Sequence, residues 1–308
     1  RFSDMDLEER KMSYGRTGYA LQFMLNPRLS DADRYPLKIN DLIVTDVDTD
    51  LAPEKILWTS DRDNENRDLP NVGLGGDRYH KPYKVIGDMI EYTGSVMSID
   101  PSGRGKDETG YAVVKMLNGQ LFVPQAGGLK GGYDELTLKQ LVNIAKDNKV
   151  NKIIIESNFG DGMFQELLKP LLFTSYPCTV EEVRHNKQKE LRIIDVLEPV
   201  LNQHKLIIDP SVIQHDYKSA QSYPIEHQAK YMLFYQLSRI TKDKGSLIHD
   251  DRLDALSIAI AYWVEQMNQV VDNNISLRKQ ELLEEELTKF TDSFYKRSIK
   301  GPRAMLWS

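Results

Sequence analysis

The sequence has a single cysteine and no long apolar run, and these two absences narrow the kind of protein that it can encode. Cys178 is the only cysteine among 308 residues, so no intrachain disulfide can form and cysteine-rich zinc sites are excluded. No apolar run approaches the roughly 20 residues of a membrane-spanning helix, and no signal-peptide pattern is present. We therefore expect a protein of a reducing cytoplasm with no membrane partner.

Several motifs of common enzyme classes are also missing. Gly103-Arg104-Gly105-Lys106 lacks the following Ser or Thr and the earlier Gly of a phosphate-binding P-loop. Asp46-Val47-Asp48-Thr49-Asp50 lacks the Gly and the bidentate Glu of a calcium loop. No Gly-x-Ser-x-Gly occurs, so a serine-hydrolase elbow is excluded.

The charge is acidic overall but unevenly placed. The net charge of −6 argues against a protein that simply coats nucleic acid. Residues 41–68 contain nine acidic and three basic residues, so this segment alone accounts for the whole net charge. A basic surface that binds DNA can therefore coexist with the acidic total.

The pattern of apolar residues predicts a mixed α/β protein. We expect strands at residues 95–99, 110–114, 120–123, 153–155, 179–180 and 206–208. We expect helices at residues 3–25, 136–145, 163–172, 191–197, 229–239, 251–267 and 276–290. Asn118-Gly119 indicates a tight hairpin, and the three successive isoleucines at 153–155 are typical of a buried parallel strand. This order predicts a sheet of antiparallel and parallel strands with helices on both faces. Such a sheet matches the ribonuclease-H-like arrangement, but the pattern alone does not distinguish it from other α/β folds.

Acidic residues stand at the ends of two of these strands and at the start of one late helix. Asp100 follows the strand at 95–99, Glu156 follows the strand at 153–155, and Asp250, Asp251 and Asp254 open the helix at 251–267. Such elements can bring carboxylates together even though the chain separates them widely. Two divalent cations held there would bridge a phosphodiester, activate a water and stabilise the leaving oxygen. Mg²⁺ suits carboxylate ligands because it is a hard ion.

Each of these acids also has a purely structural interpretation. Asp100 can end a strand, and Glu156 can be an ordinary polar strand end. Asp250 and Asp251 can cap a helix. Asp254 is harder to explain in this way because it lies one turn inside the helix, next to an apolar face. Acids this close repel one another unless a cation neutralises them, and His249 and Arg252 are the adjacent candidates for part of that role.

Two groups of basic residues are candidates for contact with DNA phosphate. Arg104 and Lys106 lie on the loop after Asp100, where Asp107 is a candidate auxiliary metal ligand. A second run contains Arg184, Lys187, Lys189 and Arg192, ahead of a helix. These side chains would bind a DNA backbone without regard to sequence, or they would form a solvated helix face.

The acidic motifs resemble those of a known family. The stretches Ile99-Asp100-Pro101-Ser102-Gly103, Ile155-Glu156-Ser157 and His249-Asp250-Asp251-Arg252-Leu253-Asp254 are similar to the nuclease motifs of phage terminase large subunits. Residues 14–27 are similar to the join between the ATPase and nuclease domains, and the likeness is greatest to the DNA maturase B of short-tailed phages. The resemblance extends over nearly the whole chain.

The resemblance implies a ribonuclease-H-like nuclease that uses Mg²⁺ or Mn²⁺ to cut concatemeric double-stranded DNA. It implies that Asp100, Glu156 and Asp251 are the metal ligands, with Asp250, Asp254 and Asp107 assisting, and the choice between Asp250 and Asp251 stays open. It also implies a capsid portal protein and a small terminase subunit as partners, in the host-cell cytoplasm and transiently at the procapsid. ATP would be bound only by an N-terminal domain that this chain lacks, so we expect no ATPase activity.

The expected organisation follows from the resemblance and from the changes in composition along the chain. Residues 1–40 would be the end of the ATPase domain and a hinge, and the chain would be a fragment of a longer polypeptide. Residues 41–91 would be an acidic linker segment with short strands. Residues 92–272 would form the nuclease domain, and residues 273–308 a C-terminal helix and basic tail.

Two other functions remain compatible with the sequence. One is a different enzyme on the same fold, such as a junction resolvase. The other is a docking module for the portal or for DNA, in which the acids only cap helices and end strands.

Overall fold

The computed structural model describes residues 34–102, 108–157 and 162–269. The chain divides into two compact units, residues 1–261 and 262–308, and the first unit contains the elements discussed below. The helices expected at residues 3–25 and 276–290 lie outside the described residues. Among the residues that are described, no helix has both the length and the apolar character needed to cross a membrane.

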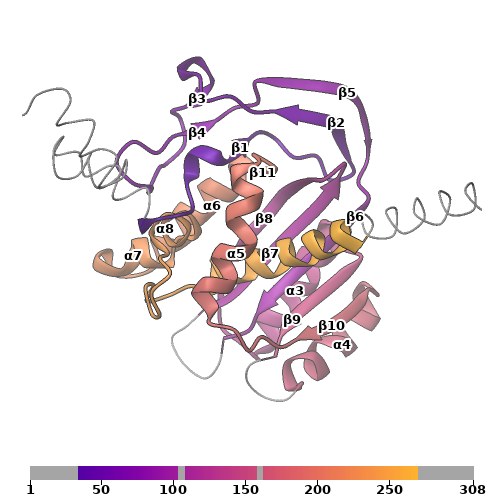
Figure 1. Cartoon of the computed structure of the whole chain (residues 1–308). Coiled ribbons are helices and arrows are strands. Elements are labelled where there is room, and N and C mark those ends of the chain that lie inside the picture. Colours follow the sequence, from indigo (N-terminus) through magenta and orange to yellow (C-terminus); the bar gives the residue numbers. More distant parts are fainter. Residues whose placement is uncertain (1–33, 103–107, 158–161, 270–308) are drawn as a thin grey trace, which may run out of the picture. The chain divides into compact units, whose positions relative to one another are not determined.

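A mixed sheet of nine strands forms the centre of the first unit (Figure 1). The order of its strands is β10-β9-β6-β7-β8-β11-β1-β4-β3. The bounds are β1 Ile43–Val44, β3 Glu65–Asn66, β4 Tyr79–His80, β6 Gly94–Asp100, β7 Glu108–Leu117, β8 Gln120–Lys130, β9 Lys152–Glu156, β10 Thr179–Val183 and β11 Leu206–Ile208. Strands β6, β7 and β8 are antiparallel, whereas β9 is parallel to both β6 and β10. The predicted mixture of antiparallel and parallel strands is confirmed.

The hairpin between β7 and β8 has the expected turn. Asn118 and Gly119 have φ values of 49° and 76°, so both residues lie in the left-handed region. A two-residue turn of this kind matches the twist of the flanking strands, and Asn-Gly is the pair that adopts it at least cost.

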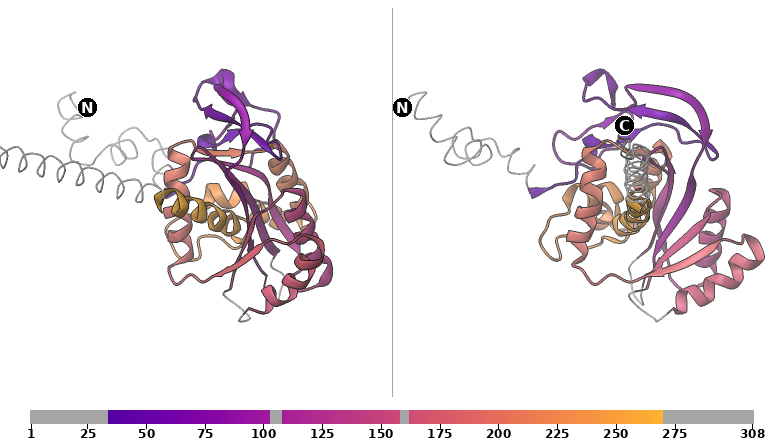
Figure 2. Two further views of the ribbon diagram at one scale, coloured as in Figure 1. Left: turned by 90° about the vertical axis from the view of Figure 1, so that its right-hand side faces the viewer. Right: turned by 45° about the vertical axis from the view of Figure 1, so that its right-hand side comes forward.

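Helices cover both faces of the sheet, as the left view of Figure 2 shows. The bounds are α3 Glu135–Asp147, α4 Met163–Ser175, α5 Lys189–Asn202, α6 Pro210–Ala220, α7 Ile225–Tyr231 and α8 Leu233–Arg239, and residues 251–261 are also helical. Side chains alternate between the two faces of a strand. Met97 and Ile99 of β6 therefore pack with α3 and α4 on one face. Ser98, between them, donates a hydrogen bond to the carbonyl oxygen of Ala255 on the other face.

Two helical details differ from the expectation. Helix α6 was not predicted, although Asp209 caps it by accepting a hydrogen bond from the backbone of Ser211 at 2.8 Å and Pro210 opens it. The single helix expected at residues 229–239 is two helices, because Met232 is extended. The Asp216 side chain accepts the amide hydrogen of Leu233 at 2.8 Å and thereby caps the second helix from a distant part of the chain.

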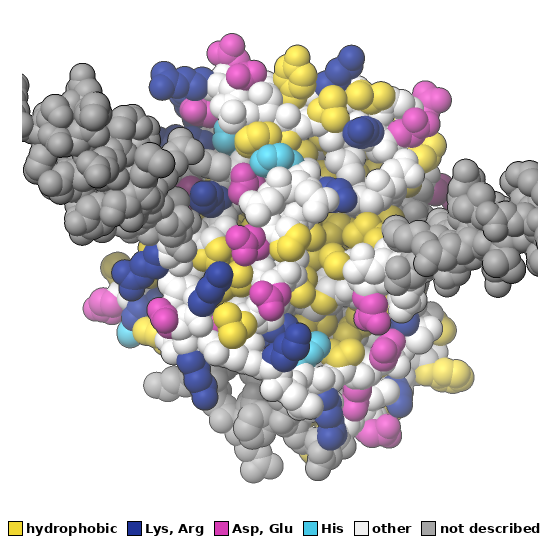
Figure 3. Space-filling view, in the orientation of Figure 1, with side chains coloured by type: hydrophobic (Ala, Val, Ile, Leu, Met, Phe, Trp, Pro, Cys, Tyr) yellow, Lys and Arg dark blue, Asp and Glu magenta, His cyan; other side chains and the backbone are white. Residues whose placement is uncertain are grey.

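The segment at residues 41–91 is more ordered than a linker. Its strands β1, β4 and β3 extend the main sheet, and β2 (Leu51–Leu57) pairs with β5 (Lys84–Glu91) in a separate two-stranded sheet. Side chains of β5 such as Val85 and Met89 are half exposed, at 52% each. Figure 3 shows hydrophobic side chains along the rim where Figure 1 draws β5.

A glycine in β7 decides how closely the helix at residues 251–261 approaches the sheet. Gly110 is the cross-strand partner of Asp100, and a Cβ atom on Gly110 would lie 2.2 Å from the carbonyl oxygen of Asp251. Because the clash would be with backbone, no rotation of a side chain can relieve it. Gly110 therefore lets the start of this helix lie directly over the end of β6.

We predict that Gly110→Ala lowers the free energy of unfolding by roughly 1–3 kcal/mol, because the added methyl group must push the helix away. Urea titration followed by circular dichroism measures this change. Gly75→Ala is the matched control, since its Cβ would have nothing within 4 Å, and a change of less than about 0.5 kcal/mol is expected there. Equal stability of the two variants would contradict the close approach.

Candidate metal centre

Two neighbouring parallel strands bring Asp100 and Glu156 to the same edge of the sheet. Asp100 is the last residue of β6, Glu156 is the last residue of β9, and Ile99 lies opposite Ile155 in the register between them. Since the two acids are one position further along parallel strands, their side chains point to the same face. The structure thus brings these two residues together.

The third carboxylate comes from the helix over this face. Asp100, Glu156 and Asp254 each offer a carboxylate oxygen, and these oxygens all lie within 4.8 Å of one another. This is the one such group of potential ligands among the residues with described positions. Asp254 is fully buried and Glu156 is 3% exposed, so the site lies at the bottom of the interface between helix and sheet.

The structure groups Asp254 with the two strand acids, whereas the resemblance had implied Asp251 as a direct ligand and Asp254 as an assistant. Asp254 is fully buried and its oxygens lie with those of Asp100 and Glu156, whereas Asp251 is not part of that group and its backbone carbonyl oxygen lies against Gly110. Asp250, one turn before Asp254, shares the ammonium group of Lys189 with Asp100 and Asp254. We therefore replace Asp251 with Asp254 in the proposed ligand set.

Lys189 lies among three of the carboxylates. Its ammonium nitrogen is 3.3 Å from Asp100 Oδ2, 2.8 Å from Asp250 Oδ1 and 2.9 Å from Asp254 Oδ2. Arg192, one turn further along α5, donates to Asp254 Oδ1 at 2.7 Å and to Glu156 Oε1 at 3.3 Å. Two cations from one helical turn thus partly offset four crowded carboxylates.

These contacts change the interpretation of Lys189 and Arg192, which the sequence indicated as candidates for binding DNA. Both side chains contact the acids, Arg192 with 10% and Lys189 with 32% of its side chain exposed. Their spacing of three residues places them on one face of α5, and this face packs beside the acidic helix. Arg252 and His249 were the expected neutralising residues, and Arg252 does not have this role.

Arg252 instead belongs to a buried network on the far side of its helix. Its guanidinium group donates to Glu108 Oε2 at 2.7 Å and to Asp216 Oδ1 at 2.7 Å, and the side chain is fully buried. A Cβ atom on Gly128 would lie 2.0 Å from the carboxylate of Glu108, so this glycine leaves room for the pair. The network ties the start of the helix to β7 and α6, and so holds Asp254 in place.

The electrostatics of the cluster favour a bound cation. Burial, together with the charges of Asp254, Glu156 and Asp250, raises the pKa of Asp100 well above its ordinary value, and Lys189 only partly opposes this. Burial would lower the pKa of Lys189, but the surrounding carboxylates outweigh it and raise that pKa. Oxygen atoms of ionised carboxylates are the ligands that Mg²⁺ and Mn²⁺ prefer, so the donor set fits either ion.

The other predicted site residues divide into two groups. Asp107, Arg104 and Lys106 lie outside the described residues. Arg184 and Lys187 are exposed on the segment that leads into α5, and Arg184 Nε donates to Ser157 Oγ at 3.2 Å.

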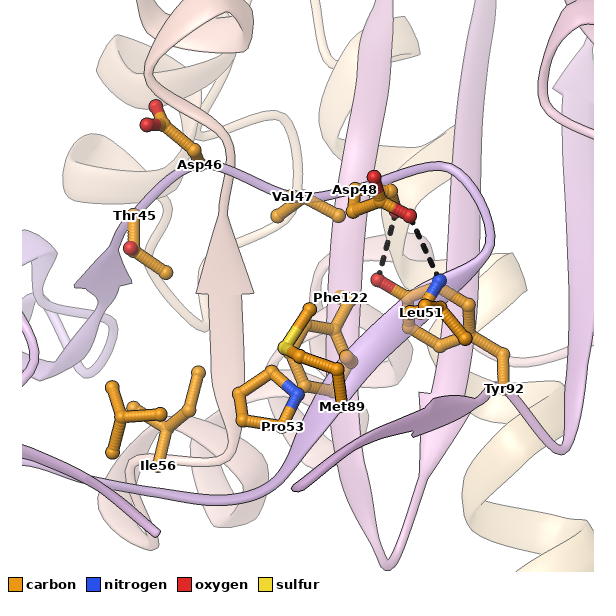
Figure 4. Close-up of a pocket in the computed structure, with 12 residues that line it drawn as sticks. Thr45, Asp46, Val47, Asp48, Leu51, Pro53, Ile56, Met89, Tyr92 and Phe122 are labelled. Atoms are coloured by element: carbon orange, nitrogen blue, oxygen red, sulfur yellow. Dashed lines mark hydrogen bonds between the residues drawn. The ribbon is translucent and has the colours of Figure 1, made fainter. Parts of the chain in front are cut away.

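A separate cavity of about 430 Å³ lies beside β2 and β5 (Figure 4). Its walls are largely apolar, and its carboxylate Asp48 accepts hydrogen bonds from the amides of Asp50 and Leu51 at 2.8 and 2.9 Å. Tyr92, just before β6, lines the cavity, whereas Asp100 ends that strand, roughly 20 Å further on. The cavity is therefore not part of the acidic site.

Comparison of the sequence with known proteins identifies relatives of the chain. The family described as "Terminase Bacteriophage T7, Ribonuclease H-like domain" matches residues 99–206. The terminase large subunit of Enterobacteria phage T3 is 47% identical over 262 residues, which cover 85% of this chain and 45% of the phage T3 protein. The chain thus spans less than half the length of that relative.

Comparison with solved structures finds partial overlaps. The large terminase nuclease from thermophilic phage G20c has 10% identity and a TM-score of 0.39, covering 74% of this chain and 98% of that chain. The human cytomegalovirus terminase nuclease domain, soaked with Mn and bound to an inhibitor, has 15% identity and a TM-score of 0.40, covering 55% and 82%. We base the conclusions below on the sequence relationship and on the positions of the side chains.

We predict that Asp100→Asn stabilises the metal-free protein increasingly as the pH rises. A raised pKa in the folded state means that Asp100 favours folding while it is protonated, and that this contribution is lost as the pH rises through the folded pKa. The Asn side chain cannot ionise, so the variant keeps its unfolding free energy where the parent protein loses stability with rising pH. Urea titrations over a series of mildly acidic to mildly basic buffers measure the difference in unfolding free energy, with the exposed Asp147→Asn on α3 as the control. A difference that shrinks towards high pH would contradict the crowding of charge at Asp100.

Proposed function

The chain belongs to the phage terminase large subunits, and its residues 99–206 match the ribonuclease H-like domain of that family, so we propose that it is a metal-dependent DNA endonuclease. The proposed reaction is hydrolysis of phosphodiester bonds in concatemeric double-stranded DNA. The observation that carries the proposal is the convergence of Asp100, Glu156 and Asp254 from two strand ends and a helix.

Asp100, Glu156 and Asp254 would hold the divalent cations, and Asp250 is a further ligand on the same side of the helix. Four carboxylates exceed the one or two that a single Mg²⁺ ion usually takes from a protein, which favours two ions. When bound, the ions would activate a water molecule and offset the charge that develops on the leaving oxygen.

The residues of α5 set the charge of the site around these ligands. Arg192 donates to both Asp254 and Glu156, so it helps to fix the orientation of the two carboxylates. Lys189 supplies a positive charge among Asp100, Asp250 and Asp254, and it thereby competes with an incoming cation. Binding of metal would require the ammonium group to withdraw from at least part of this position.

The same relationship supports the remaining partners that we propose. Double-stranded DNA would be the substrate, and the portal protein and small terminase subunit would be the assembly partners at the procapsid in the host-cell cytoplasm. The sequence has no Walker A motif, so we expect no ATPase activity from this chain alone. The domain boundaries given above remain predictions.

We predict that Asp254→Asn reduces Mn²⁺-dependent nicking of supercoiled plasmid by at least about 100-fold, because a buried ligand is lost. Asp251→Asn should keep activity within about threefold of the parent protein, since Asp251 is not among the acids whose oxygens converge. The initial rate of conversion to nicked and linear plasmid measures both effects. A larger loss of activity in Asp251→Asn than in Asp254→Asn would instead indicate Asp251 as the metal ligand.

Two outcomes of the same assay would favour another function. A strong preference for four-way junctions over linear duplex in a competition experiment would indicate a junction resolvase. A parent protein whose melting temperature does not change when Mn²⁺ is added would indicate a docking module, because an ion that binds the folded state must stabilise it.

We predict that Lys189→Ala lowers the melting temperature of the metal-free protein and tightens Mn²⁺ binding by roughly tenfold, because a competing charge is removed. Differential scanning fluorimetry over a series of Mn²⁺ concentrations measures both quantities. Lys187→Ala is the matched control, since Lys187 is exposed two residues earlier. Weaker Mn²⁺ binding by the Lys189 variant would show that the ammonium group supports the bound ions.

A further inference from the structure

The loop at residues 241–248 leads from α8 to the helix that carries Asp254 (Figure 1). It presents Lys242, Lys244 and Ile248 to solvent, and Ile248 is 70% exposed. We propose that this loop, here called the flanking loop, binds the DNA duplex beside the cleavage site. The two lysines would contact phosphates, and Ile248 would enter the minor groove. The proposal rests on the proposed nuclease function and identifies the surface that holds its substrate.

The flanking loop is held by the same helical turn that contacts the acidic cluster. Gln188 Nε2 donates to the carbonyl oxygen of Lys242 at 3.0 Å, and the carboxylate of Glu190 accepts the amide hydrogen of Gly245. Lys189, which contacts Asp100 and Asp254, lies between these two residues. The position of the loop relative to the acids is therefore determined by three successive residues of α5.

Hydrogen bonds within the flanking loop pair several of its polar groups with one another. Thr241 and Ser246 are joined by two hydrogen bonds, of 3.2 and 3.3 Å, and the Asp243 carboxylate accepts from Thr241 Oγ1 at 3.2 Å. Within the described part of the chain, neither Lys242 nor Lys244 forms an ion pair. Two ammonium groups on a fixed loop are thus available for phosphate oxygens, which Lys binds without regard to sequence.

The end of the flanking loop places an apolar side chain next to the site. Ile248 is two residues before Asp250, so their Cα atoms are at most about 7 Å apart. The intervening His249 stacks on Tyr231 with ring centroids 4.0 Å apart, and Tyr231 stacks on Tyr223 at 3.7 Å. An exposed aliphatic side chain on such a supported backbone has the character of the apolar wedges that enter the minor groove.

The lysines are tested by the salt dependence of binding to a fluorescent duplex, measured by anisotropy in EDTA so that no hydrolysis occurs. Each phosphate contact makes affinity fall roughly 3.5-fold when salt rises fourfold. A fourfold rise in salt should therefore weaken binding by the double variant Lys242→Ala with Lys244→Ala by a factor roughly 12 times smaller than for the parent protein. The control removes two charges from α3, on the other face of the sheet, with Lys139→Ala and Lys146→Ala. An unchanged salt dependence in the loop variant would overturn the proposal.

The wedge is tested with Ile248→Ser, which should weaken binding of the duplex by roughly tenfold and leave binding of the same single strand unchanged. Phe173→Ser, which removes an 83% exposed side chain from α4, is the control and should change neither. Equal losses for duplex and single strand, or no loss, would overturn the role of Ile248. These binding measurements do not depend on cleavage, so a parent protein without nuclease activity would refute the proposed function while the loop is still tested.

Discussion

The mutual repulsion of carboxylates at one edge of the sheet is the constraint on which this structure depends. Asp100, Glu156 and Asp254 lie together, Asp250 shares Lys189 with two of them, and burial makes ionisation of Asp100 costly. Lys189 and Arg192 offset part of that charge, and they do so from a single turn of α5. In the metal site that we propose, the residual negative charge would attract a divalent cation.

The surrounding fold holds these acids in place against their repulsion. Gly110 allows the acidic helix to approach the strand that ends at Asp100, and Ser98 bonds to the carbonyl oxygen of Ala255 on that helix. Arg252 anchors the other side of the helix through Glu108 and Asp216. Breaking such a buried ion pair leaves a buried charge without its partner and costs several kcal/mol of folding free energy. Movement of the helix away from the sheet is therefore unfavourable.

In the function that we propose, the residues at the start of α5 connect the DNA-binding loop with the metal site. Gln188 and Glu190 hold the flanking loop, while Lys189 between them contacts the acids. A substrate bound on that loop and an ion bound among the carboxylates would therefore act on the same few residues. This arrangement places the control of metal access within one turn of the surface that we assign to DNA.

The sequence by itself determined most of the strands and helices between residues 94 and 208, the turn at Asn118-Gly119 and the strand-end positions of Asp100 and Glu156. These features depend on local pattern and on the register of two adjacent parallel strands. It also indicated that the acids at 250–254 were unusual for a helix start.

Only the tertiary structure decided which of those acids joins the cluster and what neutralises it. The grouping of Asp254 with the two strand acids depends on how the helix lies over the sheet, which the close approach to Gly110 and the ion pair of Arg252 with Glu108 determine. The pairing of Lys189 and Arg192 with acids, and not with solvent, depends on the packing of α5 beside that helix. Such contacts join residues about 60 positions apart along the chain, and no local pattern encodes them.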